Sequence, residues 1–159
     1  MIRNATQSDI AILAEGLVRL QQMHVDAYPN IYKPFSLIDA YSHLTDLMSR
    51  TDYHIRVVIH SNRVAGHAVL AVESSVENMF KHAQRYGHLT QLEIAPETRR
   101  LGLGRLLLSD IYEIAAKLGL NRILLDVWAF NDSAHAFFSS ASYKGFGSKL
   151  TRTLAPTGG

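Results

Sequence analysis

The stretch PETRRLGLGRLLL, residues 96–108, places two arginines before two closely spaced glycines and a leucine-rich run. It follows the segment YGHLTQLEIA (86–95), which is typical of a central strand, and it opens a helical pattern over residues 103–118. The next segment, RILLDVWAF (122–130), is nearly continuous in large apolar side chains, as expected for a strand covered on both faces. We therefore predict a parallel strand–helix–strand unit with a right-handed crossover.

Two helices and a hairpin are expected before that unit. Apolar residues recur at helical spacing over residues 10–20, and Leu37, Tyr41, Leu44 and Met48 predict the buried stripe of a second helix. The strand-like segments HIRVVIH (54–60) and VAGHAVLAVES (64–74) flank the turn SNR and predict an antiparallel hairpin. Residues 75–85 are expected to form a loop or a short helical excursion.

After the unit, the sequence predicts a helix over residues 131–141 and one or two final strands within YKGFGSKLTRTL (143–154), before a frayed end. The fold class is therefore α/β, with a mixed, mostly antiparallel sheet, a central parallel strand–helix–strand unit and flanking helices. With 159 residues and 47% hydrophobic content, we expect a single domain over residues 1–159 with a sizeable core.

Composition also limits the classes of function. The formal net charge is +2, and no run of basic residues exceeds Arg99-Arg100, which argues against a nucleic-acid or membrane-surface partner. The absence of cysteine excludes thiol nucleophiles, disulfides and thiolate metal sites. Neither a signal peptide nor an apolar run of membrane-spanning length is apparent, so we expect a soluble, cytoplasmic protein. A homodimer remains an open alternative.

The turn before the central helix is suited to binding an anion. The first N–H groups of a helix lack intrahelical partners, and the helix dipole is positive there. Gly102 and Gly104 allow close approach, and Arg99 and Arg100 add donors and charge, so a pyrophosphate is the expected ligand. The spelling matches neither a P-loop nor a dinucleotide fingerprint, which needs a third glycine where Leu107 stands. The alternative is a capped helix start with solvated arginines.

The spelling Arg99-x-x-Gly102-x-Gly104, after LEIAPE and before a helix, a strand and NDSAHAFF, resembles the GCN5-related N-acetyltransferase (GNAT) superfamily. In that family, Arg/Gln-x-x-Gly-x-Gly/Ala binds the pyrophosphate of acetyl-coenzyme A, and an Asn-x-x-Ala-x-x-Phe-Tyr element lies near the thioester. The motifs cover residues 86–147, and the preceding helix–helix–hairpin order also fits. The resemblance implies the acyl-CoA N-acyltransferase fold, acetyl-CoA as co-substrate and transfer of its acetyl group to a primary amine.

The resemblance also implies which residues bind the cofactor. Family members splay the central strand from its parallel neighbour and expose its backbone to the pantetheine arm. The cofactor-binding residues implied here are Leu92, Glu93, Ile94, Arg99, Arg100, Leu101, Gly102, Leu103, Gly104, Arg105, Asn131, Phe137 and Phe138.

Two residues are candidates for the general base. Glu93 stands between two apolar residues on the central strand, where desolvation would make its carboxylate a better proton acceptor. Alternatively, Glu93 faces solvent or pairs with an arginine. His88 is the rival, because an imidazole accepts a proton near neutral pH. Many family members carry an acid where Thr90 or Gln91 stands here, which weakens any direct transfer of a role.

The general acid is where the sequence departs from the family. Family members often place a tyrosine at the position of Phe138, where its hydroxyl can protonate the departing thiolate. Phenylalanine cannot donate that proton, so solvent, Ser139 or Ser140 would have to serve. This departure, with the missing acid at Thr90, motivates an alternative function: a non-catalytic module that binds or senses acyl-CoA.

The amine acceptor is expected to contact the first two helices and the loop between them. His24, Tyr28 and Tyr32 lie in that region and are the candidate substrate-binding residues. The alternative is that they simply pack a proline-broken junction. The acceptor itself, a small-molecule or peptide amine, is not specified by the sequence. No metal site is expected, because the hairpin histidines lack the close helical spacing of a zinc motif.

Overall fold

A five-stranded sheet in the order β1-β2-β3-β4-β5 organises the first 126 residues of the protein. The computed structural model describes residues 1–154, and the end expected to fray, 155–159, lies outside the described residues. The first four strands pair antiparallel and β4 pairs parallel with β5, so the mixed, mostly antiparallel sheet is confirmed. The strands are β1 (Ile2–Asn4), β2 (Tyr53–His60), β3 (Arg63–Ser75), β4 (Gln84–Ile94) and β5 (Ile123–Leu124).

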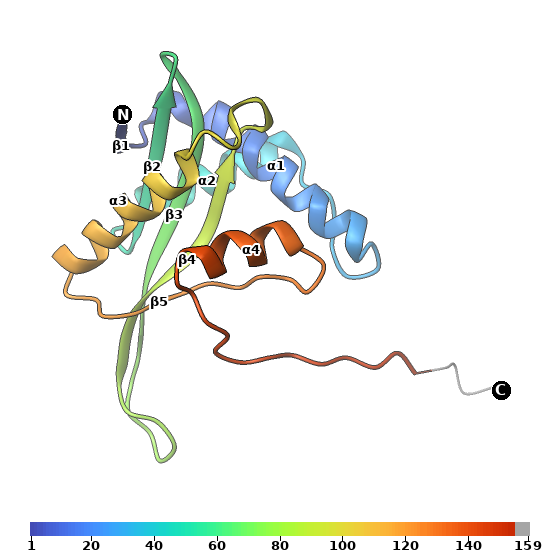
Figure 1. Ribbon diagram of the computed structural model, residues 1–159, viewed down its shortest axis with the longest axis vertical. Coiled ribbons are helices and arrows are strands. Elements are labelled where there is room, and N and C mark those ends of the chain that lie inside the picture. Colours follow the sequence, from blue (N-terminus) through green and yellow to red (C-terminus); the bar gives the residue numbers. More distant parts are fainter. Residues whose placement is uncertain (155–159) are drawn as a thin grey trace. The chain divides into compact units, whose positions relative to one another are not determined.

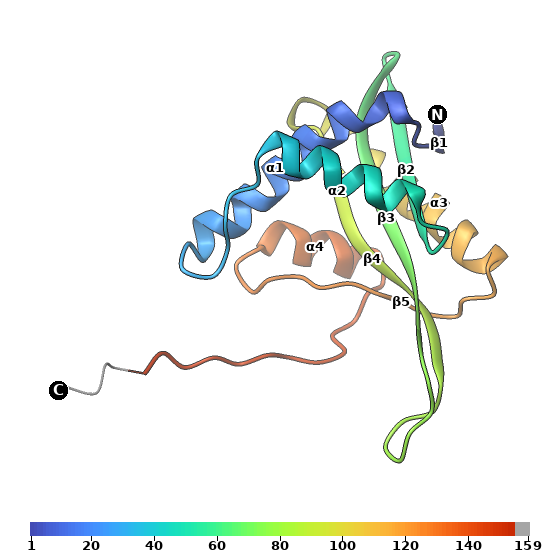
Figure 2. The ribbon, with the colours of Figure 1, turned by 180° about the vertical axis from the view of Figure 1, so that it is seen from behind.

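Helices cover both faces of this sheet. Helices α1 (Ile10–Ala27) and α2 (Leu37–Ser49) lie on one face, and α3 (Leu103–Lys117) lies on the other (Figures 1 and 2). Short 3-10 turns, η1 (Gln7–Asp9) and η2 (Pro96–Thr98), precede α1 and follow β4. Within residues 1–154, no helix has both the length and the apolar character needed to span a membrane.

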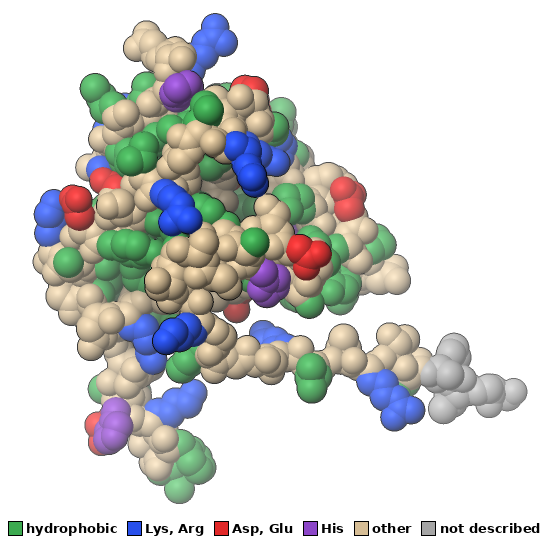
Figure 3. All heavy atoms as spheres, viewed as in Figure 1, with side chains coloured by type: hydrophobic (Ala, Val, Ile, Leu, Met, Phe, Trp, Pro, Cys, Tyr) green, Lys and Arg blue, Asp and Glu red, His purple; other side chains and the backbone are tan. Residues whose placement is uncertain are grey.

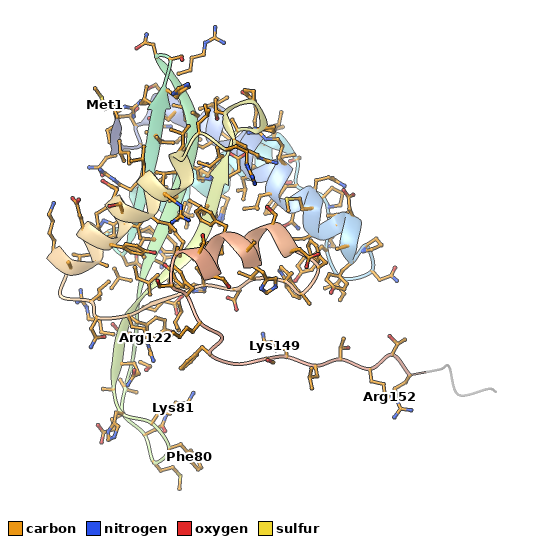
Figure 4. The ribbon with its side chains drawn as sticks, viewed as in Figure 1. Met1, Phe80, Lys81, Arg122, Lys149 and Arg152 are labelled. Atoms are coloured by element: carbon orange, nitrogen blue, oxygen red, sulfur yellow. The ribbon has the colours of Figure 1, made fainter. Side chains whose placement is uncertain are left out.

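The predicted hairpin is confirmed as β2 and β3, and residues 76–83 form the loop that joins β3 to β4. Figure 4 shows Phe80 and Lys81 at the far end of that loop. The second helix is confirmed, and its buried stripe was half right: Leu44 is buried and Met48 packs against the core, but Leu37 and Tyr41 are exposed. Ala40 and Leu47 are buried in their place. Ser36 caps the helix by accepting a hydrogen bond from Asp39 N, and the inward row begins one turn later than predicted.

The chain divides into two compact units between Asp126 and Val127, and each is described by itself. The expectation of a single domain therefore stays a prediction. The second unit contains α4 (Asp132–Ser140), which confirms the predicted helix. Its N-cap is Asn131, whose side chain accepts a hydrogen bond from Ala134 N at 3.1 Å.

One strand prediction was too long and another was wrong. The parallel strand expected over 122–130 is present only as the two-residue β5, both of whose residues are partly exposed, because its pairing with β4 ends at His88 and Leu124. The described segment 143–154 contains no strand. Gly145 and Gly147 disfavour extended structure there, and no neighbouring strand supplies the ladder that an isolated strand needs.

Candidate active site

The loop from β4 into α3 ends in a helix start suited to an anion. Gly102 is the N-cap of α3 with φ = 79°, a left-handed conformation that favours glycine, and its helix start has no side-chain capping bond. A Cβ at Gly102 would meet no atom within 4 Å, so the space before the helix is open. Figure 3 shows Lys and Arg side chains gathered near this helix start. An open helix start with nearby cations is suited to a phosphate group, so the residues present fit the pyrophosphate of coenzyme A.

The two arginines of this loop are placed differently. Arg99 donates from Nε to the carbonyl oxygen of Ile94 at 3.0 Å, which fastens the loop to the end of β4. Arg100 has a positive φ of 66° and an exposed side chain. Both side chains are exposed, but the Arg99 guanidinium is fastened to the end of β4.

A bulge in β4 turns part of its backbone towards an open edge. Val69 pairs with Gln91 and Leu70 with Leu89, so Thr90 is the extra residue of a bulge. Before it, Gly87 N donates to the carbonyl of Arg122 on the β5 side at 2.9 Å. After it, Ala95 N donates to Ala65 O on the β3 side at 2.9 Å.

Because backbone groups alternate along a strand, these two bonds place the N–H and C=O groups of Leu92 and Ile94 on the edge away from β3. In the described residues, β5 pairs with β4 only at Gly87 and His88, so this edge is open. An extended chain can bind such an edge through backbone hydrogen bonds. Leu92 and Ile94 therefore present backbone groups on this edge, where the Ile94 carbonyl also accepts from Arg99 Nε, and their contact with a pantetheine arm stays a prediction.

The side chain of Glu93 leaves the strand on the face of the sheet that α1 covers, where it enters a buried cluster. Its carboxylate is only 7% exposed, and its Oε1 accepts hydrogen bonds from Arg19 Nε and Nη2 at 3.3 and 3.1 Å. Its Oε2 lies 3.9 Å from Nδ1 of His67, which faces Glu93 across the β3–β4 ladder. The arginine pairing and the burial, which the sequence offered as separate possibilities, are both present.

His67 is itself almost completely buried. Its Nε2 lies 3.1 Å from Gln91 Oε1. Burial lowers the pKa of His67, although the Gln91 bond and the Glu93 charge act in the opposite direction. Gly16 of α1 completes the cluster, because a Cβ there would stand 2.9 Å from Glu93 Oε2 and 3.2 Å from His67 Cε1.

A small cleft of about 80 Å³ opens onto this cluster. Three of its lining side chains, Glu15, Glu93 and Glu97, are carboxylates, and Arg19 is the permanent cation. The other lining residues are Ile12, Leu13, Val64, Gly66, His67 and Ala95. With a neutral His67, the balance of formal charge is negative, which favours a cationic guest.

His88 lies in a different cluster. Its Nδ1 is 2.6 Å from Glu73 Oε1 and its Nε2 is 3.2 Å from Asp126 Oδ2. Hydrogen bonds from Tyr86 and His88 hold the pKa of Glu73 below its ordinary value. Five residues of strand separate His88 from Glu93, about 17 Å, so the structure does not bring the two candidate bases together. Among residues 1–154, no group of three His, Asp or Glu side chains could hold a metal ion.

The predicted acceptor residues lie beyond the cleft. His24 and Tyr32 have ring centroids 5.4 Å apart near the end of α1, and Tyr28 is the C-cap of that helix. None of the three lines the cleft described above. Eight residues of helix separate Gly16 from His24, about 12 Å. Burial lowers the pKa of His24.

The predicted residues of the second unit form a local aromatic cluster. The ring of Phe138 packs edge-on against Phe137 at 5.2 Å and against Tyr143 at 5.4 Å between centroids. Asn131 serves as the cap of α4.

Sequence reasoning missed four members of the Glu93 cluster: Gly16, Arg19, His67 and Gln91. A glycine inside a helical pattern was the one usable signal, because it often marks a close approach. The other three come from elements distant in sequence or lie among unremarkable strand residues. Only the packing of α1 against β3 and β4 brings them together.

The fold is that of an α/β protein with helices on both faces of a mixed sheet and an open-edged central strand. The chain belongs to the GNAT acetyltransferase family, because the model of the Acetyltransferase (GNAT) family matches residues 17–143. A search of curated proteins found no match.

Solved structures with the same fold are distant in sequence. A tetramutant of the BH1408 protein from Bacillus halodurans has 19% identity and a TM-score of 0.91, covering 97% of this chain and 99% of that one. The aminoglycoside 6'-N-acetyltransferase AAC(6')-IG from Acinetobacter haemolyticus has 13% identity and a TM-score of 0.73, covering 98% of both chains. The aminoglycoside N-acetyltransferase AAC(6')-Iy, in complex with CoA, has 10% identity and a TM-score of 0.77, covering 97% and 93%.

Proposed function

We propose that this protein transfers the acetyl group of acetyl-CoA to a primary amine, with Glu93 as the general base. The observation that carries the proposal is the position of Glu93. Its side chain is buried at the base of a negatively charged cleft, and it belongs to β4, whose edge away from β3 is open. A deprotonated amine is required for attack on a thioester, and a carboxylate beside the amine can take its proton.

The chain's own groups provide for the acyl donor. The thioester of acetyl-CoA supplies the acetyl group. The first-turn N–H groups of α3, with Arg99 and Arg100, would hold the pyrophosphate, and the backbone of Leu92 and Ile94 would hold the pantetheine arm. Gly102 leaves the approach to the helix open.

The charge of the cleft supports a cationic acceptor. Glu15 and Glu97 are exposed and would attract an ammonium group towards Glu93. A volume of about 80 Å³ admits the amine end of an acceptor rather than a large ring system. Two fold neighbours are aminoglycoside acetyltransferases, whose acceptors are also amines, so small polycationic amines are the first class to test.

The test is a thiol-release assay with acetyl-CoA and a panel of acceptors: a polyamine, an aminoglycoside, free amino acids and a peptide with a free N-terminus. We expect turnover with at least one cationic amine and a loss of about 100-fold or more in kcat for Glu93→Gln. CoA affinity, measured by calorimetry, should be unchanged in Glu93→Gln. The matched control is Glu113→Gln on the exposed side of α3, which should keep full activity.

Two results would contradict the proposal. CoA binding without thiol release from any acceptor would favour the non-catalytic acyl-CoA-binding module. Full turnover by Glu93→Gln, with an unchanged pH profile, would remove Glu93 as the base.

A further inference from the structure

We propose that His67 is a positioning residue for Glu93. The unprotonated Nδ1 of His67 accepts a hydrogen bond from the Glu93 carboxyl group once that group has taken the proton of the amine. The inference rests on the role of Glu93 in the proposed function. It assigns a role to a buried side chain that does not touch the substrate itself.

The hydrogen-bond partner of His67 sets which ring nitrogen carries the hydrogen. Gln91 presents its carbonyl oxygen, Oε1, to Nε2 at 3.1 Å. A carbonyl oxygen only accepts hydrogen bonds, so Nε2 must be the donor. Burial keeps the ring neutral, and a neutral ring has only one N–H. Nδ1 therefore carries a lone pair and faces Glu93.

The distance between Nδ1 and Glu93 Oε2 fits a bond that forms only after proton transfer. At 3.9 Å it is about 1 Å longer than a hydrogen bond. While Glu93 is ionised, two acceptors face one another and no bond can form. Once Oε2 carries a proton, its O–H can donate to Nδ1 with a small rotation of the carboxyl group. The proton passes from the ammonium nitrogen to Oε2 and later leaves through the cleft to water, and no electrons are gained or lost.

The remaining charged groups around Glu93 act differently from His67. Arg19 of α1 donates to Oε1 and favours the ionised carboxylate. Glu15, also on α1, and Glu97, after β4, line the cleft and disfavour a further negative charge. Arg19 thus contacts Oε1, whereas His67 faces Oε2, the oxygen that receives the proton.

Gly16 makes this arrangement possible. Its missing side chain lets α1 pack against both Oε2 and the His67 ring, because a Cβ at position 16 would stand only 2.9 Å from Glu93 Oε2 and 3.2 Å from His67 Cε1. Any larger residue would occupy the space in which the carboxyl group must rotate. On the side of α1, the Oε2–Nδ1 pair therefore faces backbone rather than a competing polar side chain.

The tautomer can be measured without any assay of activity. Nitrogen NMR of the full-length, 15N-labelled protein separates protonated from bare ring nitrogens, and the spectrum of His67→Asn identifies the His67 signals. We expect Nε2–H and a bare Nδ1. An Nδ1–H tautomer or a doubly protonated ring at pH 7 would overturn the inference, even if Glu93 proves to be the base.

The kinetic test compares His67→Leu, which removes the acceptor, with His67→Asn, whose side-chain oxygen can replace Nδ1. In His67→Leu we expect kcat to fall about tenfold, which corresponds to the loss of one hydrogen bond. His67→Asn should restore kcat, and KM for acetyl-CoA should change in neither variant.

Gln91→Met provides a second variant if His67→Leu does not fold. It removes the carbonyl oxygen that fixes the His67 tautomer and should lower kcat in the same way. Equal losses of kcat in the Leu and Asn variants would mean that His67 only fills space and would overturn the inference. Failure of the proposed function is recognised separately, because Glu93→Gln would then leave turnover unchanged.

Discussion

Gly16 of α1 lies directly against the carboxylate of Glu93, since a Cβ at position 16 would stand 2.9 Å from Oε2. The contact joins the first helix to the central strand at the proposed base. The atom that a Cβ would displace is the end of a flexible side chain, so the fold can accommodate a methyl group by moving the carboxylate. We therefore expect a small structural cost and a large catalytic cost from a side chain at this position.

Gly16→Ala is expected to lower kcat at least tenfold, because a displacement of the base by about 1 Å can cost 100-fold in rate. Its thermal stability should change little, since alanine raises helix propensity by about 1 kcal/mol and offsets the local crowding. Steady-state kinetics and thermal unfolding of the same preparation measure both effects.

Gly119→Ala is the matched control for that substitution. Gly119 has φ = 69° and no atom within 4 Å of its Cβ position, so alanine there introduces backbone strain without touching the site. We expect a loss of about 1 kcal/mol in stability with unchanged kcat. A Gly16→Ala enzyme with full activity would show that the carboxylate is not needed where it lies.

Arg100→Ala is expected to weaken binding of CoA. A charge-assisted hydrogen bond contributes about 1.5–3 kcal/mol, so the Kd should rise about 10- to 100-fold in calorimetry. Acetylpantetheine, which lacks the pyrophosphate, should bind the variant and the wild type equally. Lys117→Ala, in the last turn of the same helix, is the control and should bind CoA normally. An equal loss of affinity for acetylpantetheine would place Arg100 away from the pyrophosphate.

Local patterns in the sequence predicted the elements that depend on local physics. The hairpin, the three long helices and α4 follow from periodicity and capping, and the glycine-capped start of α3 follows from the spelling around Gly102. The expected strand over 122–130 failed for a non-local reason. The pairing of β4 with β5 ends after His88, next to the bulge at Thr90. The apolar sequence of residues 122–130 contains no signal for this end of pairing.

In the candidate site too, residues could be predicted where local sequence was sufficient and not where long-range packing was needed. Glu93 could be proposed from its own position in a central strand, and its pairing with an arginine was a stated alternative. The identity of that arginine, Arg19, could not be predicted, because it lies 74 residues away and is brought in by helix packing. The role of His67 likewise depends on register, which sets it opposite Glu93.

Asp9 is expected to contribute to stability above pH 4 through its contacts with Arg3 and Thr6. Its carboxylate, 6% exposed, accepts hydrogen bonds from Arg3 Nη1 at 2.6 Å and Nη2 at 2.9 Å. The backbone N–H of Thr6 donates to Oδ2 at 2.7 Å. These bonds, the Arg3 bond foremost, lower the pKa of Asp9 to about 2 and connect β1 to the start of α1.

The direction of the pH dependence follows from that shift. Unfolded Asp9 titrates near its ordinary pKa of 3.8. Between pH 3.8 and pH 2 the unfolded chain therefore binds more protons than the folded chain, and stability decreases as the pH is lowered. Asp9→Asn should therefore cost about 2 kcal/mol at pH 7, and the difference from wild type should shrink as the pH falls through 4 towards 2. Urea unfolding followed by circular dichroism at pH 7 and at lower pH measures this. Asp46→Asn, an exposed carboxylate on α2, should change stability by less than about 0.5 kcal/mol. A cost for Asp9→Asn that is the same at every pH would mean that shape, rather than charge, makes Asp9 stabilising.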